Sequence, residues 1–463
     1  MSQKNNTRLG YKHQGHSVQV DTIGHLSPLA VAVCQQLADD PFVTQRTLAQ
    51  SLNISAQELQ QISSIVRMDR TAQNYIMHGG SGTKYWANTV TPLLLNGSLH
   101  AAIDNYYMYP NRVGLYTGMS CMFYCNFCGR NPVAKYNKSY EQIGFDVFKQ
   151  IIDQDPKTDA HWEDRFRISG GLEPLTNRYL GDIISYGTSK GYKMQLYTNG
   201  FMMTDKYIND HPGMKELYAV RFSLYGVDSE SAYNVTKHPN SFDNIIDNII
   251  NYINNTTTAT KVGVNWIILP GHSGDVIKLI DVVDRINQCA NRPLDFVTLR
   301  EDFGQNIRVV SDQERVSLID IFAQIHQFKT HKWPATHWDF GYALEPLVHG
   351  QNAGALTMIS WQDMIPESFP QVSVAVDVKG DLYVYHESGF LDRPGANRYI
   401  IGNIINSSVE QVVKKFIGKK IRPMPTDIGY LDAFDHVVSR LINQARDDEA
   451  FGIPWSKGPV AYR

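Results

Sequence analysis

An alternation of short apolar runs with longer amphipathic segments, between residues 111 and 302, limits the fold of this chain more than any other feature. The short runs are rich in β-branched and aromatic residues and have the pattern of strands: 112–118, 165–171, 193–200, 219–226, 262–271 and 295–302. The segments between them, such as 140–153, 242–253 and 274–288, carry apolar residues at helical spacing. Strands and helices that alternate in this way predict a parallel sheet covered by helices. An α/β barrel, complete or partial, is the natural closure of such a sheet.

Three cysteines follow directly on the first of these predicted strands. Cys121, Cys125 and Cys128 form a CxxxCxxC pattern, and the aromatic Phe127 precedes the third cysteine. In an α/β barrel the loops after the carboxyl ends of the strands form the active site, so the cysteines fall at the expected place. Three thiolates at this spacing can hold three irons of a [4Fe–4S] cluster and leave the fourth iron open to a ligand.

Two other interpretations of the cysteines remain open. A structural zinc site needs four ligands and often uses CxxC pairs, but no second pair of cysteines follows at a suitable distance. A disulfide is disfavoured because the N-terminus lacks the apolar core of a signal peptide, and a reducing cytoplasm suits these thiols. Cys34 and Cys289 lie in apolar helical patterns, which predicts two small buried residues.

Charge and hydropathy argue against two kinds of partner. The net charge of −3 over 463 residues disfavours a general nucleic-acid binder, because neutralising phosphates needs a basic surface. No run of 18 apolar residues occurs, so we expect no transmembrane helix. We therefore expect a cytoplasmic protein that binds neither nucleic acid nor a membrane, while its oligomeric state is left undefined.

Segments on both sides of the predicted barrel have a different character. The N-terminal part has helical periodicity, and Ser55 with Glu58 three residues later forms a candidate capping box. The C-terminal part combines helices with a strand hairpin that turns at Gly380. We expect the following division: a helical domain at 1–100, the barrel at 101–310 and an α+β extension at 311–463.

Several polar residues fall at the ends of the predicted strands. The second strand ends in Gly170-Gly171-Leu172-Glu173, where glycine backbone can approach a ligand closely and a carboxylate can accept a hydrogen bond from an ammonium group. A plain strand-to-helix turn is the alternative. On the fourth strand, Arg221, Ser223 and Tyr225 share the face that points into a barrel, while the residues between them face the helices.

Charged residues after the sixth strand and after the hairpin are less specific. Arg300, Glu301 and Asp302 are either a salt-bridged rim or substrate contacts. His386 and Glu387 could titrate near a substrate, or they could belong to a solvated strand end.

The CxxxCxxC pattern with its aromatic residue, followed in order by these strand ends, resembles the signature of the radical S-adenosylmethionine (SAM) enzymes. The resemblance implies a [4Fe–4S] cluster on Cys121, Cys125 and Cys128 and SAM as the second cofactor. It also implies that the apolar turn at 267–271 lies along the adenine. The residues that it places on SAM are Gly170, Gly171, Glu173, Asn199, Arg221 and Ser223. The chain departs from the family pattern at Leu172, which separates the two glycines from Glu173.

Longer segments resemble one branch of this family, the radical SAM deaminases of desosamine biosynthesis that act as dTDP-4-amino-4,6-dideoxy-D-glucose ammonia-lyases. Among these segments are 169–177, 295–304 and 369–390, and the resemblance runs from about residue 80 to about residue 443. It implies that a 5′-deoxyadenosyl radical removes hydrogen from carbon 3 of a sugar nucleotide, after which ammonia leaves carbon 4. It also implies a flavodoxin- or ferredoxin-type electron donor. Arg300 is the candidate contact to the diphosphate, because arginine pairs bidentately with phosphate oxygens.

Two alternatives to an ammonia-lyase remain. A related enzyme could be a dehydratase, a dehydrogenase or a decarboxylase on another sugar or aminoglycoside, because all share the first hydrogen abstraction. A noncatalytic iron–sulfur sensor is a different class, in which two of the N-terminal helices would form a DNA-binding helix-turn-helix.

Overall fold

A computed structural model of the chain describes residues 12–13, 16–17, 22–80, 82–131, 133–157, 165–301, 311–341, 344–348, 368–419 and 433–460. The chain divides into two compact units. The first contains Met1–Gly97 and Val437–Arg463, and the second contains Ser98–His436. The C-terminal part of the chain therefore contributes to both units.

The first unit is built mainly of helices, as the sequence predicts. Its principal elements are α1 (Pro28–Asp39), α2 (Gln45–Leu52), α3 (Ala56–Met68), α4 (Arg70–His78), α5 (Thr83–Tyr85), α6 (Thr91–Leu95) and most of α17 (Ala433–Phe451). Side chains cap the first turns of α1 to α4, which satisfies backbone N–H groups that have no partner within the helix. The predicted capping box is present, because Ser55 and Glu58 each accept from the other's backbone.

The second unit is organised around a 10-stranded sheet with the order β12-β11-β10-β3-β4-β5-β6-β7-β8-β9. All six predicted strands form: β3 (Arg112–Tyr116), β4 (Phe166–Ile168), β5 (Gln195–Thr198), β6 (Ala219–Leu224), β7 (Lys261–Ile268) and β8 (Phe296–Glu301). The remaining strands are β9 (His337–Phe340), β10 (Ser373–Asp377), β11 (Asp381–Tyr383) and β12 (Ile400–Asn403). From β10 through β9 every neighbouring pair is parallel, and β11 and β12 pair antiparallel. The predicted α/β class is therefore confirmed.

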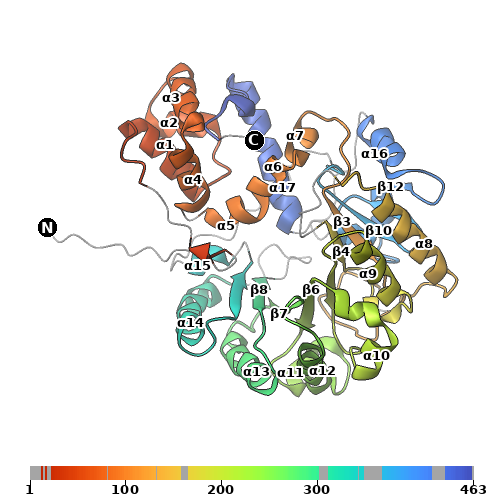
Figure 1. Ribbon diagram of the computed structural model, residues 1–463. Helices are drawn as coiled ribbons and strands as arrows, with labels where there is room; N and C mark the ends of the chain where they lie inside the picture. Colours follow the sequence, from red (N-terminus) through yellow and green to blue (C-terminus); the bar gives the residue numbers. More distant parts are fainter. Residues whose placement is uncertain are drawn as a thin grey trace. The chain divides into compact units, whose positions relative to one another are not determined.

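Helices cover one face of this sheet, as Figure 1 shows. They are α8 (Tyr140–Asp153), α9 (Leu180–Ser189), α10 (Asp205–Asp210), α11 (Ser229–Thr236), α12 (Ser241–Asn255), α13 (Asp275–Cys289) and α14 (Asp312–His331). The core lies between these helices and the sheet, where Phe222 and Leu224 of β6 pack with Ile249 of α12. Since side chains alternate along a strand, Arg221 and Ser223 face the opposite, inner side. This is the orientation that the sequence predicts for β6.

The predicted C-terminal hairpin is β10 and β11, which turn at Gly380 with φ of +79°. Its first strand also pairs parallel with β3, in the register Asp377 opposite Tyr116. The strand β10, around residue 375, therefore extends the sheet next to β3, which is the strand that leads to the cysteines. Within the described residues β9 and β12 are the two edges, so the sheet forms an open, partial barrel.

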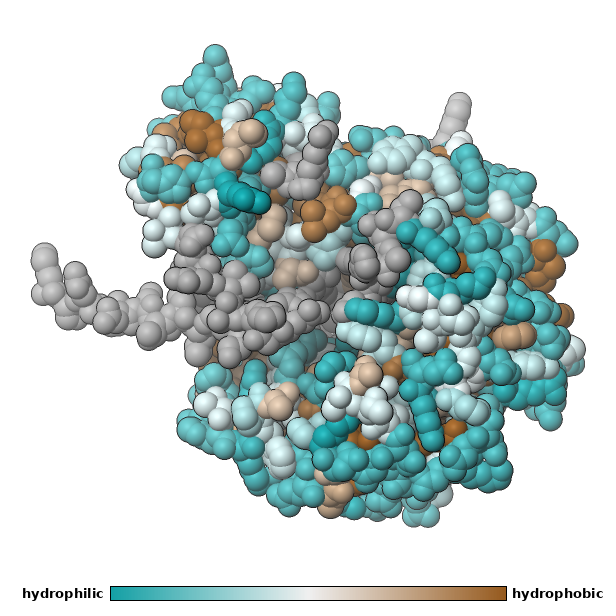
Figure 2. Space-filling model, viewed as in Figure 1, coloured by the Kyte–Doolittle hydropathy of each residue, from teal (hydrophilic) through white to brown (hydrophobic). Residues whose placement is uncertain are grey.

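Two further expectations can be compared with the structure. Cys34 is buried as expected, but the prediction for Cys289 was wrong, because it lies exposed at the last turn of α13. Apolar residues recur at helical spacing up to the end of α13, but at Cys289 the chain has already left the core. None of the described helices is both long enough and apolar enough to cross a membrane. In Figure 2 the apolar residues on the visible face form small groups between hydrophilic ones.

Candidate active site

The cysteine loop lies at the carboxyl end of β3 and is fixed by backbone hydrogen bonds at several points. Within the loop, the Cys128 N–H donates to the carbonyl of Cys125 at 3.1 Å. The Tyr124 N–H donates to the carbonyl of Thr236, the last residue of α11, at 2.9 Å. The loop therefore bridges from β3 to the connection that follows β6.

The three thiols are partly buried and lie close enough to influence one another. Burial is the main cause that raises the pKa of Cys121 to about 11, and it also raises the pKa values of Cys125 and Cys128. The charge of Cys128 raises the pKa of Cys121 and that of Cys125 further. Deprotonated, these thiols would form a concentrated negative charge that a bound metal centre can neutralise.

The number of cysteines distinguishes a cluster from a structural zinc site. A structural zinc site is closed by four protein ligands. The loop carries three free cysteines, Cys121, Cys125 and Cys128, which suffice for three irons of a [4Fe–4S] cluster. The loop therefore fits such a cluster better than structural zinc.

The Gly-Gly-Leu-Glu segment after β4 is hydrogen-bonded directly to the chain that leads into the cysteines. Glu173 and Ser120 form an isolated antiparallel bridge, in which the Glu173 N–H donates to the Ser120 carbonyl at 2.9 Å. The Thr176 hydroxyl accepts from the Met119 N–H at 2.9 Å, and the Asn177 amide donates to the Thr117 carbonyl at 2.8 Å. Two motifs that lie about 50 residues apart in the sequence thus form one structural unit.

Glu173 is buried. In the part of the chain that the structure describes, its carboxylate accepts hydrogen bonds from other groups of the protein. Its oxygens accept from the Thr198 hydroxyl, from the Leu175 N–H at 3.1 Å and from the Asn199 N–H at 2.9 Å. Burial raises the pKa of Glu173 to about 7, and these three hydrogen bonds oppose the rise. The carboxylate therefore ties the segment after β4 to the end of β5.

The glycine pair adopts a conformation that other residues rarely reach. Gly170 and Gly171 have φ values of +65° and +62°. A Cβ on Gly170 would lie 2.3 Å from the ring of Tyr116, so this glycine is also required by packing. The hydroxyl of Tyr116 donates to the carbonyl of His386 at 2.6 Å, which connects the pair to the segment after β11.

Asn199, at the end of β5, lies beside the cysteine loop as the sequence suggested. Its side-chain amide approaches Met122 Sδ at 3.3 Å and Cys121 Sγ at 4.0 Å. Its amide oxygen accepts from the Phe201 N–H at 2.9 Å, which fixes the orientation of the side chain.

The two predicted residues of β6 occupy successive positions on the inner face. Arg221 donates to the Thr298 hydroxyl at 3.1 Å, and its guanidinium lies 4.3 Å from the ring centroid of Phe296. Ser223 lies one step nearer the carboxyl end, in register with Asn265 of β7. Ser223 is therefore the nearer of the two to the cysteine loop along the strand, while Arg221 contacts residues of β8.

The other charged candidates lie in different surroundings. Arg300 is exposed near the end of β8, and Asp302 lies outside the described residues. His386 is buried, and its Nε2 is hydrogen-bonded to the Ser373 hydroxyl, so a solvated strand end was the wrong alternative for this residue. Glu387 lies 3.8 Å from the guanidinium of Arg393.

Two residues beside the cysteines were not predicted to have this role. Tyr225 packs its ring 5.5 Å from that of Phe127 and 6.3 Å from that of Phe123. Arg130 is buried, and its guanidinium donates to the carbonyl of Phe123 between the first two cysteines. The only signal in the sequence was the closeness of Arg130 to Cys128, which by itself does not predict where a long side chain points.

In this parallel βα sheet three cysteines follow β3, and the residues just before them are hydrogen-bonded to Glu173 and Thr176 in the segment after β4. This arrangement defines an enzyme of the radical SAM class. Comparison with known sequences narrows this class. The chain is 32% identical, over 445 residues, to dTDP-4-amino-4,6-dideoxy-D-glucose ammonia-lyase of Streptomyces venezuelae. The match covers 94% of this chain and 90% of the relative. The chain therefore belongs to the family of this ammonia-lyase.

Other comparisons add less. No protein-family model matches the chain. Among solved structures, Streptococcus suis SuiB bound to the precursor peptide SuiA has a TM-score of 0.44 and 12% identity, covering 80% of this chain and 72% of that one. The enzyme anSMEcpe with bound AdoMet has a TM-score of 0.43 and 12% identity, covering 77% of this chain and 93% of that one. Both likenesses are too distant to define a function.

Proposed function

We propose that this protein is a radical SAM ammonia-lyase that converts dTDP-4-amino-4,6-dideoxy-D-glucose to dTDP-3-keto-4,6-dideoxy-D-glucose. The observation that carries the proposal is the identity of 32% with an ammonia-lyase of this name, which extends over 94% of the chain. The physical support is the cysteine loop, which is hydrogen-bonded to the segment after β4 at the carboxyl edge of the sheet.

The cofactors are assigned to residues that the fold brings to this edge. Cys121, Cys125 and Cys128 would hold the [4Fe–4S] cluster, and the backbone of Gly170 and Gly171 would lie against SAM. Bound together, the cluster and SAM supply a 5′-deoxyadenosyl radical that removes the hydrogen atom from carbon 3 of the sugar.

The remaining predicted SAM residues act in different ways in this proposal. Asn199 and Ser223 would contact SAM directly, because both lie on the inner side near the cysteine loop. Glu173 would be a positioning residue, since its oxygens already accept from Thr198 and from backbone groups that include the Asn199 N–H. Arg221 would contact SAM through the guanidinium N–H groups that do not donate to Thr298.

Aromatic side chains would keep water away from the reacting groups. Phe123 packs against Phe201 at 5.7 Å between ring centroids and against His238 at 5.5 Å. Tyr225 packs against both Phe123 and Phe127. A radical needs such a site, because excluding solvent prevents side reactions.

Arg300 is our candidate for the diphosphate of the sugar nucleotide. It lies near the carboxyl end of β8, and its guanidinium can reach solvent where a large ligand enters. Its two parallel N–H groups match phosphate oxygens.

A one-electron donor of the flavodoxin or ferredoxin type would bind beside the cysteine loop. No acidic residue occurs between residues 121 and 140. We call the exposed aromatic, aliphatic and lysine residues of this segment and of the end of α11 the donor face: Tyr124, Val133, Lys135, Lys138, Tyr233 and Lys237. An acidic partner is favoured here, because lysines around apolar side chains attract negative charge and leave a dry centre.

The direct test is anaerobic reconstitution with iron and sulfide, followed by incubation with SAM, a reductant and dTDP-4-amino-4,6-dideoxy-D-glucose. Release of ammonia together with 5′-deoxyadenosine, with both lost in Cys125→Ala, is the expected result. A protein with an intact cluster that leaves SAM uncleaved would contradict the radical SAM assignment.

The same experiment separates this lyase from related enzymes. A dehydratase would release water, a dehydrogenase would remove two hydrogens and a decarboxylase would release carbon dioxide, and product mass distinguishes all four. If 5′-deoxyadenosine forms while the sugar stays unchanged, the chemistry stands and the substrate is a different one.

A further inference from the structure

Arg130 is a buried cation placed inside the loop that carries the cysteines. Only 6% of the residue is exposed, although arginine is rarely buried without a specific reason. It follows the third cysteine by two positions, and its guanidinium turns back to donate to the Phe123 carbonyl, which lies between the first and second cysteines. A second, weaker contact joins its Nη1 to the Asn131 carbonyl at 3.4 Å. The side chain therefore spans the loop from its end to its beginning.

The contact of Arg130 places its charge inside the loop. The carbonyl that accepts from the guanidinium belongs to Phe123, which lies two residues after Cys121 and two residues before Cys125. Because the residue is buried, water does not screen this charge as it screens the charge of an exposed lysine. The buried positive charge therefore lies within the loop that carries all three cysteines.

A cluster in this loop would be an anion. Three thiolates give −3 and an oxidised [4Fe–4S] core gives +2, so the site carries −1 before it takes up one electron from the reductant and −2 afterwards. A fixed positive charge nearby stabilises the second state more than the first. Charge and hydrogen bonds to sulfur are recognised determinants of cluster potential.

We propose that Arg130 is a positioning residue that holds the anionic cluster and raises its reduction potential through its buried positive charge. The inference rests on the proposed function only in requiring that the cysteines hold a [4Fe–4S] cluster. It goes further in naming a residue outside the ligand set that decides how readily the cluster accepts its electron.

The test compares variants of Arg130 that separate charge from hydrogen bonding. Arg130→Lys keeps a positive charge, whereas Arg130→Gln keeps an N–H donor for the Phe123 carbonyl and removes the charge. Lys138→Gln removes one positive charge from an exposed position of the same segment and serves as the matched control. Each full-length protein is reconstituted, and iron per chain, circular dichroism and the midpoint potential from an EPR-monitored titration are measured without SAM.

We expect Arg130→Gln to lower the ratio of reduced to oxidised cluster at a fixed potential by about tenfold, which is about 59 mV for a one-electron couple. Arg130→Lys should stay near the wild type, and Lys138→Gln should change little because water screens its charge. A folded Arg130→Gln protein that loses iron, while Arg130→Lys keeps it, also supports the proposal.

Two outcomes overturn it. If Arg130→Gln keeps both the iron and the potential of the wild type, the side chain merely closes the loop. If Arg130→Lys loses the cluster or shifts as far as Arg130→Gln, the shape of the guanidinium matters and its charge does not. A wild-type protein that holds no four-iron cluster would instead contradict the proposed function itself, so the two failures are distinguishable.

Discussion

At the scale of single residues, Glu173 connects the segment after β4 to the end of β5. Leu172 separates this carboxylate from the glycine pair, and the carboxylate accepts from Thr198, Leu175 and Asn199 of the protein. In the function that we propose, Glu173 therefore acts on SAM through the end of β5.

Glu173→Gln should therefore weaken SAM binding without abolishing cluster assembly. Glutamine replaces one accepting oxygen with an NH₂ group that faces an N–H or O–H donor, which costs about 1–3 kcal/mol. We expect the dissociation constant of SAM, measured by calorimetry on the reconstituted protein, to rise about tenfold. Glu58→Gln, which removes a carboxylate from the capping box of α3, is the control. Unchanged SAM affinity would show that the end of β5 does not depend on Glu173.

Asp448 makes a pH-dependent contribution to the first unit. It is buried and accepts from the Gln45 N–H at 2.7 Å, and burial raises its pKa to about 7. A carboxyl whose pKa is higher in the folded state binds more protons there than in the unfolded chain. Its contribution to stability is therefore complete below about pH 4 and is lost as the pH rises toward 7.

Asp448→Asn should remove this dependence while keeping an oxygen that can accept from Gln45. Relative to the variant, the wild type should lose roughly 2–4 kcal/mol of unfolding free energy between pH 4 and pH 7. Thermal unfolding at a series of pH values measures the difference in unfolding free energy between the two proteins. Contributions from titratable groups that both proteins share cancel in this difference. Parallel curves for the two proteins would refute the assignment.

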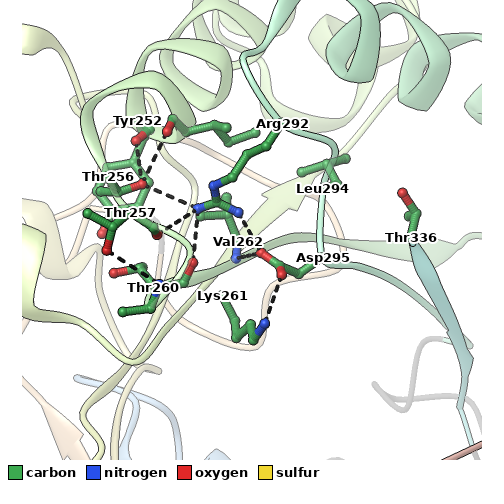
Figure 3. A network of polar contacts seen from close by, with 12 residues as sticks. Tyr252, Thr256, Thr257, Thr260, Lys261, Val262, Arg292, Leu294, Asp295 and Thr336 are labelled. Carbon is green, nitrogen blue, oxygen red and sulfur yellow. Dashed lines mark hydrogen bonds and ion pairs between the residues drawn. The ribbon is translucent and has the colours of Figure 1, made fainter. Parts of the chain in front are cut away.

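At the scale of elements, the amino ends of β7 and β8 are joined by one polar network, shown in Figure 3. The Arg292 guanidinium donates to Asp295 at 2.8 Å and to the Thr260 carbonyl at 2.9 Å. Asp295 also accepts from the Val262 N–H at 2.9 Å and from Lys261 at 3.2 Å. This network lies at the end of the strands opposite to the cysteine loop, so it serves the fold alone.

Arg292→Ala should therefore lower stability without changing the chemistry. Its side chain is 14% exposed and that of Asp295 is 20% exposed, so losing the pair leaves a largely buried carboxylate and should cost about 2–4 kcal/mol. Lys261→Ala removes the other cation from the same Asp295, but this lysine is 49% exposed and should cost less than about 1 kcal/mol. Urea unfolding of both variants tests the contrast, and equal losses would contradict it.

The elements of the barrel were predictable because each one satisfies a local rule. The alternation of polar and apolar side chains along β6 places Ser223 and Phe222 on opposite faces of the sheet. In the helical unit, the capping box at Ser55 identifies the start of α3. The pairing of β10 with β3 was not predictable, since a strand pattern near Val376 carries no information about a partner more than 250 residues earlier. Arg130 was missed for the same reason, because a single arginine after a cysteine has no periodic context.

At the scale of the whole molecule, the distribution of surface charge bears on the electron donor that we propose. The overall charge is −3, yet the donor face defined above contains lysines and no acidic side chain. A local excess of one sign steers an oppositely charged partner even when the net charge of the protein has the same sign as that partner.

Replacing Lys135, Lys138 and Lys237 together by glutamate should therefore impair turnover with flavodoxin by about tenfold or more, mainly through KM. Turnover with dithionite, which needs no docking surface, should stay near the wild type. Raising the ionic strength should reduce the flavodoxin-driven rate of the wild type more than that of the triple variant. Equal effects with both reductants would move the docking site elsewhere.

The parallel pairing of β10 with β3 has a consequence for the order in which the protein is made. A ribosome finishes Arg112–Tyr116 and the cysteines long before it reaches Ser373–Asp377, because synthesis adds about 5–20 residues per second. Throughout that interval β3 lacks one of its neighbouring strands. The carbonyl of His386, which accepts a hydrogen bond from the Tyr116 hydroxyl, has not yet been made. The strand that leads into the cysteines therefore reaches its final packing only after the chain has been made as far as His386.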